Sequence, residues 1–276
     1  MRSVKSLLAA GAATLISSMA FAADMPIAAP PPMYSPPAPP ADFGGWYLRG
    51  DVGMTNQSAK RIESSIAYPT TTEGLGFDSS PLFDLGVGYR FNNWFRTDVI
   101  GQYRGKANLH GANNVTYSAT DFGSNNYSGS KSEWVVMANA YVDLGTWWCI
   151  TPFIGAGVGG SYNKISGFRD DGTRINGLGL SNSVTYFGDN GKWNLAWAAH
   201  AGLAYKVNPG FTVELAYSYM NLGDAAPGNY RFYDYSQSGP TSIKIKDITS
   251  HDVKLGVRWD LNSPPAYMPP PLVTKG

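Results

Sequence analysis

Apolar and polar residues alternate along several short segments of this chain. In VKLGVRWDL, residues 253–261, every second residue from Val253 to Trp259 is apolar, and Lys254 and Arg258 stand between them. Such alternation predicts a β-strand with two unlike faces. The apolar face either packs on a soluble core, or meets lipid while the polar face lines a lumen.

Seven further segments have the same period, and no segment shows the 3.6-residue period of an amphipathic helix. We therefore expect an all-β chain with strands at 46–54, 82–91, 95–104, 135–144, 150–162, 194–205, 211–220 and 253–261. No apolar run after residue 22 reaches the roughly 18 residues that a transmembrane helix needs. If the chain spans a membrane, it does so with strands.

The connections between these segments fall into two classes. Short turns are expected at 92–93, 145–149 and 207–210, and long polar loops at 55–80, 105–131, 163–192 and 221–250. Short turns at one end and long loops at the other are typical of an outer-membrane barrel, whereas a Greek-key sandwich would not sort its loops by length. The pattern predicts an eight-stranded antiparallel transmembrane β-barrel.

Large aromatic residues lie at the strand ends beside the short turns. Such rings are stable at a membrane interface, and we expect them to form a girdle there. The members are Trp46, Phe91, Trp94, Trp147, Trp148, Tyr205, Phe211 and Trp259. Tyr103, Trp134, Tyr162 and Tyr219 lie toward the long loops and are expected to form a second girdle. The apolar faces are therefore expected to meet lipid.

The opposite, inward positions carry charges of both signs in nearly equal number. They are Arg49, Asp51, Asp84, Arg90, Arg96, Asp98, Arg104, Asp143, Glu214, Asp252, Lys254, Arg258 and Asp260. The interior of an eight-stranded barrel is only wide enough for side chains to fill it. Because unpaired buried charge is costly, we expect these groups to pair as a plug, with Gly155, Gly157 and Gly159 making room for long neighbours.

The two ends of the chain differ from the barrel. Residues 1–22 have a charged start, an apolar run and small residues Ala20 and Ala22, which predicts a secretory signal peptide cleaved after Ala22. Residues 23–44 and 262–276 are rich in proline, and we expect extended periplasmic arms around a barrel at 45–261. These arms could contact peptidoglycan or periplasmic proteins.

Composition excludes several functions. The net charge of +1 gives no basic excess for nucleic acid, and the single cysteine, Cys149, excludes a disulfide framework within the chain. Ser250, His251 and Asp252 are consecutive, so on a strand they point to alternate faces and cannot form a triad. The spacing of the three histidines suggests no metal site. We expect no enzyme activity and no cofactor.

The sequence resembles the small outer-membrane β-barrel proteins of alphaproteobacteria, called porin-family proteins or major surface antigens and related in architecture to the OmpA barrel. The resemblance rests on AFAAD (20–24), GWYLRGDVG (45–53), ANAYVDLGTWW (138–148) with TPFIGAGVG (151–159), and HDVKLGVRWDL (251–261). It implies a Gram-negative outer membrane with lipid and lipopolysaccharide around the barrel, loops outside the cell and both termini in the periplasm. It also implies an assembly signal for the barrel-assembly machinery, matched by Lys254, Gly256, Trp259 and Leu261.

Three functions agree with these features. The first is a non-enzymatic structural protein and surface antigen, which the balanced lumen charges favour. The second is a small diffusion porin, as the family label implies. The third is an adhesin or a binder of a flat ligand such as haem, through loop aromatics such as Tyr127, Tyr230, Phe232, Tyr233 and Tyr235.

Overall fold

The computed structural model describes residues 44–63 and 70–261. The expected signal peptide with Ala20 and Ala22, the N-terminal arm up to residue 43 and the C-terminal arm at 262–276 lie outside the described residues. No helix within the described ranges is long and apolar enough to cross a membrane.

The described chain forms strands joined by turns, and every strand pairing in it is antiparallel. The strands are β1 (Gly45–Glu63), β2 (Thr70–Phe77), β3 (Ser80–Arg90), β4 (Phe95–Ser118), β5 (Asp121–Asp143), β6 (Ile150–Asn176), β7 (Gly179–Phe187), β8 (Asn190–Asn208), β9 (Phe211–Ala225), β10 (Tyr230–Phe232), β11 (Ser238–Gly239) and β12 (Lys244–Asp260).

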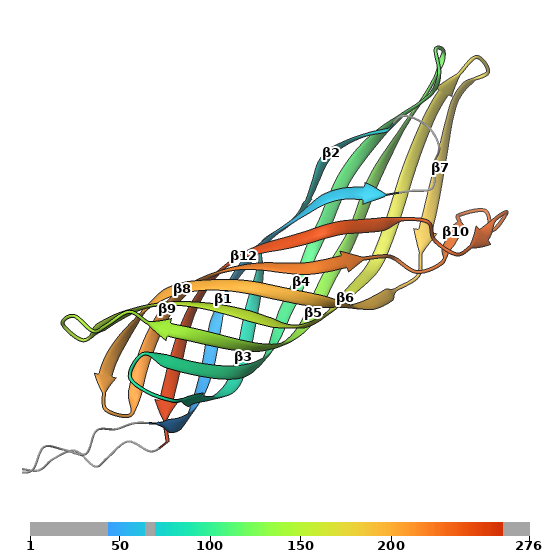
Figure 1. The fold of residues 1–276 in the computed structure, drawn as a ribbon. Coiled ribbons are helices and arrows are strands. Elements are labelled where there is room, and N and C mark those ends of the chain that lie inside the picture. Colours follow the sequence, from blue (N-terminus) through green and yellow to red (C-terminus); the bar gives the residue numbers. More distant parts are fainter. Residues whose placement is uncertain (1–43, 64–69, 262–276) are drawn as a thin grey trace, which may run out of the picture. The chain divides into compact units, whose positions relative to one another are not determined.

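Eight of these strands close into a barrel. The ring runs in the order β1, β3, β4, β5, β6, β8, β9 and β12, and β12 pairs with β1 again (Figure 1). These eight match the eight predicted segments, three of which were predicted one residue too long, and short connections at the predicted turns 92–93, 145–149 and 207–210 join them, with residues 207–208 still in β8. The predicted all-β barrel is confirmed.

The two faces of the ring strands differ as the alternation requires. Along β1, Leu48 and Val52 are exposed on the outside, whereas Arg49 and Asp51 between them are buried inside. Along β12, Leu255 is exposed while its neighbours Lys254 and Gly256 are buried. An apolar outer face and a polar interior make the fold the inverse of a soluble barrel.

The prediction of four long polar loops was wrong, because most of these residues belong to strands. β4 and β5 continue in register from Ala107 opposite Lys131 to Thr116 opposite Phe122, and after a register shift Ser118 lies opposite Asp121. His110, expected in a loop, therefore lies in β4. The Asn-, Ser- and Gly-rich composition of these segments has low β-propensity, but each strand satisfies the backbone groups of its neighbour.

The barrel wall changes at one end, where β6 exchanges partners. β6 pairs with β8 up to Ile165 and with β7 from Arg169 onward. Beyond this point β2, β4, β5, β6, β7, β10 and β11 continue as one open sheet, which we call the extension. Figure 1 shows the β4–β5 and β6–β7 hairpins of this extension at the upper right.

The interior contains both buried ionic residues and a buried apolar cluster. The buried apolar cluster lies toward the extension and includes Leu109, Val135, Ile165, Leu222, Ile245 and Ile248. Buried ionic residues lie on the side of the short turns and again at Arg104, Lys131 and Glu133, beyond inward apolar residues such as Ile100 and Val135. Ionic and apolar side chains together fill the interior.

Candidate functional site

Glu214 on β9 lies at the centre of the ionic interior near the short turns. Its Oε1 lies 2.5 Å from Arg258 Nη1 on β12 and 3.4 Å from Arg96 Nη2 on β4, while Oε2 lies 3.5 Å from Arg49 Nη2 on β1. Three strands thus direct a guanidinium at one carboxylate. A barrel brings these residues together because each is an inward position of its own strand.

Arg49 connects this cluster to further inward side chains of β1, β4 and β5. Its Nη2 lies 2.8 Å from Asp51 Oδ2, and its Nη1 donates at 3.0 Å to Asp98 Oδ2 and at 2.9 Å to the Tyr141 hydroxyl. Lys254 Nζ reaches Asp84 Oδ2 at 3.4 Å. Charge-assisted contacts of this kind offset the cost of removing the ions from water.

A second ionic cluster lies closer to the extension, around Arg104. The side chain of Arg104 is 0% exposed and pairs with Asp252, also 0% exposed. It donates at 2.7 Å to the Ser250 hydroxyl and at 3.0 Å to the Thr55 hydroxyl. With Arg96, it is among the largest fully buried side chains of the described chain.

Lys131 and Glu133 also belong to this second cluster, and sequence reasoning missed them. The two are paired with each other, Lys131 Nζ donates at 2.8 Å to Gln57 Oε1, and Arg104 Nε lies 3.6 Å from Glu133 Oε2. Extending the alternation of β5 back from Asn139 by two-residue steps would have placed both inside. They add one charge of each sign.

A cavity of about 260 Å³ lies at the short-turn end of the barrel, and Arg90, Asp143 and Arg258 of the ionic network are among its lining residues. Arg90 Nη2 lies 3.6 Å from Asp260 Oδ1, and Arg96 Nε donates at 3.3 Å to Asp143 Oδ1. All the charged residues expected in the lumen therefore have an ionic partner inside the barrel. The interior that they fill is neutral or nearly so.

Glycines of β6 accommodate the bulk of this interior. A Cβ on Gly155 would overlap the ring of Tyr141, and a Cβ on Gly157 would overlap the Asn139 side chain. The Arg96 guanidinium in turn lies over the Tyr141 ring, with its Cζ 4.3 Å from the ring centroid. The inward glycines thus let β5 place long side chains toward the centre.

The aromatic residues expected at the short-turn end lie on the outside of the barrel. Trp46, Phe91, Trp94, Trp147, Trp148, Tyr205 and Trp259 are exposed and Phe211 is half-buried. At the other end, Tyr103 packs on Trp134 with ring centroids 4.8 Å apart, and Tyr162 packs on Trp193 at 5.3 Å. Along β12 the span from Trp259 to His251 covers about 26 Å of strand, which at the about 35–45° tilt of such strands corresponds to roughly 20 Å across the bilayer.

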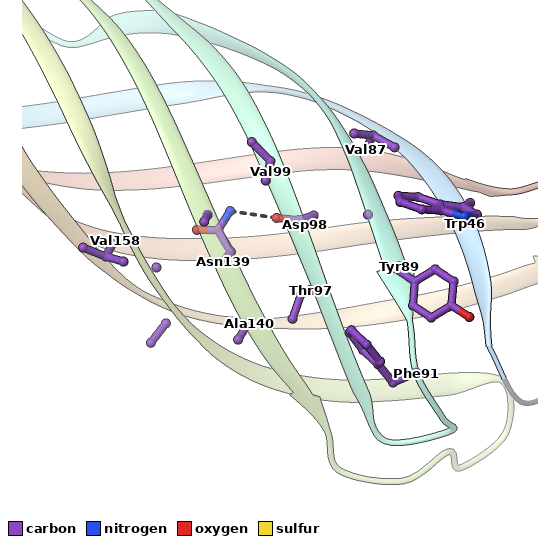
Figure 2. A pocket seen from close by; sticks show the side chains of 14 residues that line it. Trp46, Val87, Tyr89, Phe91, Thr97, Asp98, Val99, Asn139, Ala140 and Val158 are labelled. Carbon is purple, nitrogen blue, oxygen red and sulfur yellow. Dashed lines mark hydrogen bonds between the residues drawn. The ribbon is translucent and has the colours of Figure 1, made fainter.

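A groove of about 890 Å³ crosses the outer face of β3, β4, β5 and β6. Figure 2 shows Trp46, Tyr89 and Phe91 at its short-turn end and Val158 at the other. Small residues such as Ala138 and Ala140 form its floor, and the hydrogen bond from Asn139 Nδ2 to Asp98 Oδ1, 2.8 Å long, lies behind it (Figure 2). The groove is a depression of the apolar face rather than a passage through the wall.

The residues considered for catalysis are separated by the strand geometry. Ser250 and Asp252 point inward and are buried, whereas His251 points outward and its Nδ1 lies 2.6 Å from the Tyr217 hydroxyl. His200 is inside, with Nδ1 2.8 Å from the Ser218 hydroxyl. Across residues 44–63 and 70–261, no three His, Cys, Asp or Glu side chains group as a metal site.

The residues of the expected assembly signal divide between the two faces of β12. Lys254 and Gly256 face the interior, where Gly256 lies against the Asp51 carboxylate. Trp259 and Leu261 are exposed outside, and the Leu261 amide donates at 2.9 Å to the Trp46 carbonyl. Cys149 is an exposed free thiol in the turn between β5 and β6.

The aromatic residues that were expected in the long loops form two groups, one around a cavity and one exposed to solvent. Tyr127 of β5 and Tyr230 and Phe232 of β10 lie around one cavity, whereas Tyr233 and Tyr235 are exposed to solvent in the turn after β10. The first three come together because β10 continues the extension beside β7.

A closed ring of strands with an apolar exterior and an ionic interior defines a membrane-spanning β-barrel protein. The chain belongs to the outer membrane protein beta-barrel domain family, whose sequence profile matches residues 8–260. It is therefore an outer-membrane protein of bacteria.

Relatives agree in length with this chain. An uncharacterized protein of Brucella suis is 28% identical over 278 residues, which cover 89% of this chain and 95% of that protein. A Rickettsia bellii protein named "Putative adhesin" is 27% identical over 235 residues, covering 80% of this chain and 91% of that one.

Two solved structures are similar at low identity. Neisserial surface protein A is 17% identical with a TM-score of 0.41, over 79% of this chain and 97% of that one. The outer membrane protein OprG of Pseudomonas aeruginosa is 15% identical with a TM-score of 0.40, over the same shares of 79% and 97%.

Proposed function

We propose that this protein is a non-enzymatic structural protein of the outer membrane whose barrel is closed to solutes and whose extension is displayed outside the cell as a surface antigen. The observation that carries the proposal is the filled lumen. Two ionic clusters, around Glu214 and Arg104, occupy the barrel in succession, and apolar side chains fill the interior between and beyond them.

Closure follows from the energetics of these contacts. A water path would require the Arg96 and Arg104 side chains, each 0% exposed, to leave their carboxylate partners. Breaking a buried ion pair costs about 3–5 kcal/mol, and these side chains share partners with several others. A diffusion porin needs a water-filled lumen that forms without breaking buried ion pairs.

The experiment for closure is a current recording across a planar lipid bilayer that contains the refolded protein. We expect a silent bilayer, with folding verified by the heat-dependent gel shift of the same sample. The double variant Arg96→Ala/Arg104→Ala removes two of the largest buried side chains and is expected to admit current steps. Stable steps from the folded wild type would reject the closed barrel and establish a diffusion channel.

The orientation is supported by the asymmetry of the two ends. The short turns, the start of β1 at Gly45 and the end of β12 at Asp260 lie at one end, the extension lies at the other, and outer-membrane barrels keep their short turns in the periplasm. Cys149, in a short turn, should therefore resist a membrane-impermeant maleimide added to intact cells. The variant Cys149→Ser/Thr120→Cys moves the thiol to the tip of the β4–β5 hairpin and should be labelled. If wild-type cells were labelled and cells with the variant were not, the short turns would face outward and the proposed orientation would be wrong.

A second candidate is an adhesin that acts through the extension. The tip of the β6–β7 hairpin exposes Ile175 at 57%, Leu178 at 99% and Leu180 at 66%, and exposed apolar groups outside the membrane band mark contact surfaces. The name of the Rickettsia relative supports the same candidate. Replacing these three residues with Ser should lower attachment of expressing bacteria to host cells, while Ala119→Ser/Thr120→Ser at the tip of the other hairpin should not.

A further inference from the structure

A second, smaller cavity lies in the extension, beyond the barrel. It has a volume of about 270 Å³, and we call it the aromatic recess. Its lining residues are Tyr127, Asp170, Thr185, Phe187, Tyr230, Phe232, Thr241, Ser242 and Ile243. No Lys, Arg or His is among these lining residues.

Strand register brings the recess together from four strands. Tyr127 of β5 is directly opposite Asp170 of β6, Asp170 is opposite Thr185 of β7, and Thr185 is opposite Phe232 of β10. Residues paired in this way point to the same face of a sheet. A carboxylate therefore lies in the middle of a row whose two ends are aromatic.

One oxygen of the Asp170 carboxylate has no hydrogen-bond partner within the described chain. Its Oδ1 is buried and accepts no hydrogen bond there. The nearest cation in sequence, Arg169, points to the other face and holds Asp171 with a contact of 2.6 Å from Nη2 to Oδ1. A buried carboxylate oxygen without a hydrogen bond costs free energy, which a cation entering the recess would recover.

The aromatic rings favour the same kind of ligand. Tyr230 and Phe232 are neighbours at 5.8 Å between ring centroids, and Phe187 packs edge-on against Phe168 at 5.1 Å. The face of such a ring attracts a cation, by about 0.5–2 kcal/mol. A volume of 270 Å³ is below the roughly 300–1,000 Å³ of pockets for drug-sized ligands, so the recess fits a group of side-chain size rather than a macrocycle.

We propose that the aromatic recess binds an organic cation, an ammonium or guanidinium group, between the Asp170 carboxylate and the rings of Tyr230 and Phe232. The cation arrives either as a free small amine or as a basic side chain of another protein. The site is independent of whether the barrel conducts, so a failed conductance experiment leaves it standing.

The test is a titration of the refolded, isotope-labelled protein followed by amide NMR shifts of Thr185 and Ile243. The detergent is a neutral maltoside, because choline-headed detergents are themselves organic cations. Tetramethylammonium chloride is added at about pH 8, where Asp170 is ionised, against sodium chloride of equal ionic strength. We expect saturable shifts with the ammonium salt and none with sodium.

Two variants separate this site from general charge effects. Asp170→Asn keeps the size of the side chain and should weaken the affinity at least about tenfold, as expected for loss of a desolvated charge partner. Asp171→Asn removes the neighbouring carboxylate on the opposite face and should leave affinity within about twofold. Phe232→Ala should weaken binding while the gel shift confirms folding. Equal losses in the two Asp variants, or no saturable shift in the wild type, would overturn the proposal.

The source of the cation is distinguished with capped tripeptides. Gly-Lys-Gly and Gly-Arg-Gly are compared with tetramethylammonium, and Gly-Gln-Gly serves as the uncharged control. Tighter binding of a basic peptide supports a protein side chain as the ligand, and tighter binding of tetramethylammonium supports a free amine. Binding of Gly-Gln-Gly as tight as that of the basic peptides would refute recognition of charge.

Discussion

Gly256 of β12 lies directly opposite Asp51 of β1, and the Asp51 carboxylate occupies the space that a side chain at Gly256 would need. Asp51 is held there by Arg49, 2.8 Å away. The glycine that matches the expected assembly signal thus also has a packing role inside the finished barrel.

The variant Gly256→Ala should therefore destabilise the folded barrel itself. Displacing a buried, paired carboxylate by one methyl group is overpacking, which costs about 1–3 kcal/mol. The measurement is the urea dependence of refolding into lipid vesicles. Gly101→Ala is the control, because a Cβ there meets no atom within 4 Å. If Gly256→Ala refolds normally in vitro yet fails to assemble in cells, the glycine acts through the assembly signal and not through packing.

Replacing Glu214 with Gln should be among the most damaging single changes in the lumen. Arg49, Arg96 and Arg258 would lose the carboxylate they share, and leaving buried charge unpaired costs about 3–5 kcal/mol. In the same unfolding measurement, Glu63→Gln breaks the exposed Arg61–Glu63 pair and should cost less than about 1 kcal/mol. Similar losses for the two variants would mean that water enters the lumen and screens its charges.

The lipid-facing surface can be tested on one face of one strand. Leu255 lies midway between Trp259 and His251 on the outer face of β12. His251 packs on Tyr219, in the girdle nearer the extension. Leu255→Arg should cost about 2–4 kcal/mol and His251→Arg about 0–1 kcal/mol, since the penalty for a cation falls from the bilayer centre to its interface. Equal costs in vesicles would show that Leu255 is not at the bilayer centre.

Asp170 is expected to titrate near neutral pH. Burial, with a smaller contribution from the Asp171 charge, raises the pKa of Asp170 to about 7, from about 3.9 for an unperturbed Asp. Its carboxyl carbon resonance should show an inflection near pH 7. Tyr127 from β5, Asp171 on β6 and Tyr230 from β10 are the other titratable groups around it, and β7 contributes only Thr185 and Phe187.

The sign of the linked stability change follows from the raised pKa. The folded state binds the Asp170 proton more tightly than the unfolded state, so this group stabilises the extension at pH values below about 4. The contribution is lost as the pH rises through 7. Relative to Asp170→Asn, which cannot ionise, the wild type should lose stability between about pH 4 and pH 8. A constant difference between the two proteins over that range would contradict the raised pKa.

The strands could be predicted from the sequence only where their two faces carry residues of different polarity. From Trp46 to Met54, lipid outside and ionic groups inside impose a strict alternation, so strand and faces could be read from the residues. Beyond Met54 the inward residues Thr55 and Gln57 stay buried, but the outward residues are polar, so Asn56, Gln57 and Ser58 look like a loop in the sequence. What makes them a strand is the pairing with β12, to which they are opposed at His251, Ser250 and Thr249.

The lumen could be predicted for the same reason, and the aromatic recess could not. Arg49 and Glu214 occupy regular inward positions, so their shared interior follows once the barrel is assumed. Asp170 and Phe232 are 62 positions apart in sequence and come together only because β6 changes partner from β8 to β7. No periodicity within either segment reports that exchange.

The seam between β1 and β12 joins the two ends of the barrel sequence, from Tyr47 opposite Asp260 to Glu63 opposite Lys244. The ring therefore cannot be sealed until its last strand has arrived, and that strand delivers Asp252, Lys254 and Arg258. Until then Arg104, Asp84 and Glu214 lack these partners and must keep their hydration. Closure of the sheet, dehydration of the charges and their pairing are consequently one event, so a half-closed barrel has neither full solvation nor a complete set of ion pairs. Such an intermediate is high in free energy, which makes folding of the barrel cooperative and slow, as expected for a topology sealed by its most distant contacts.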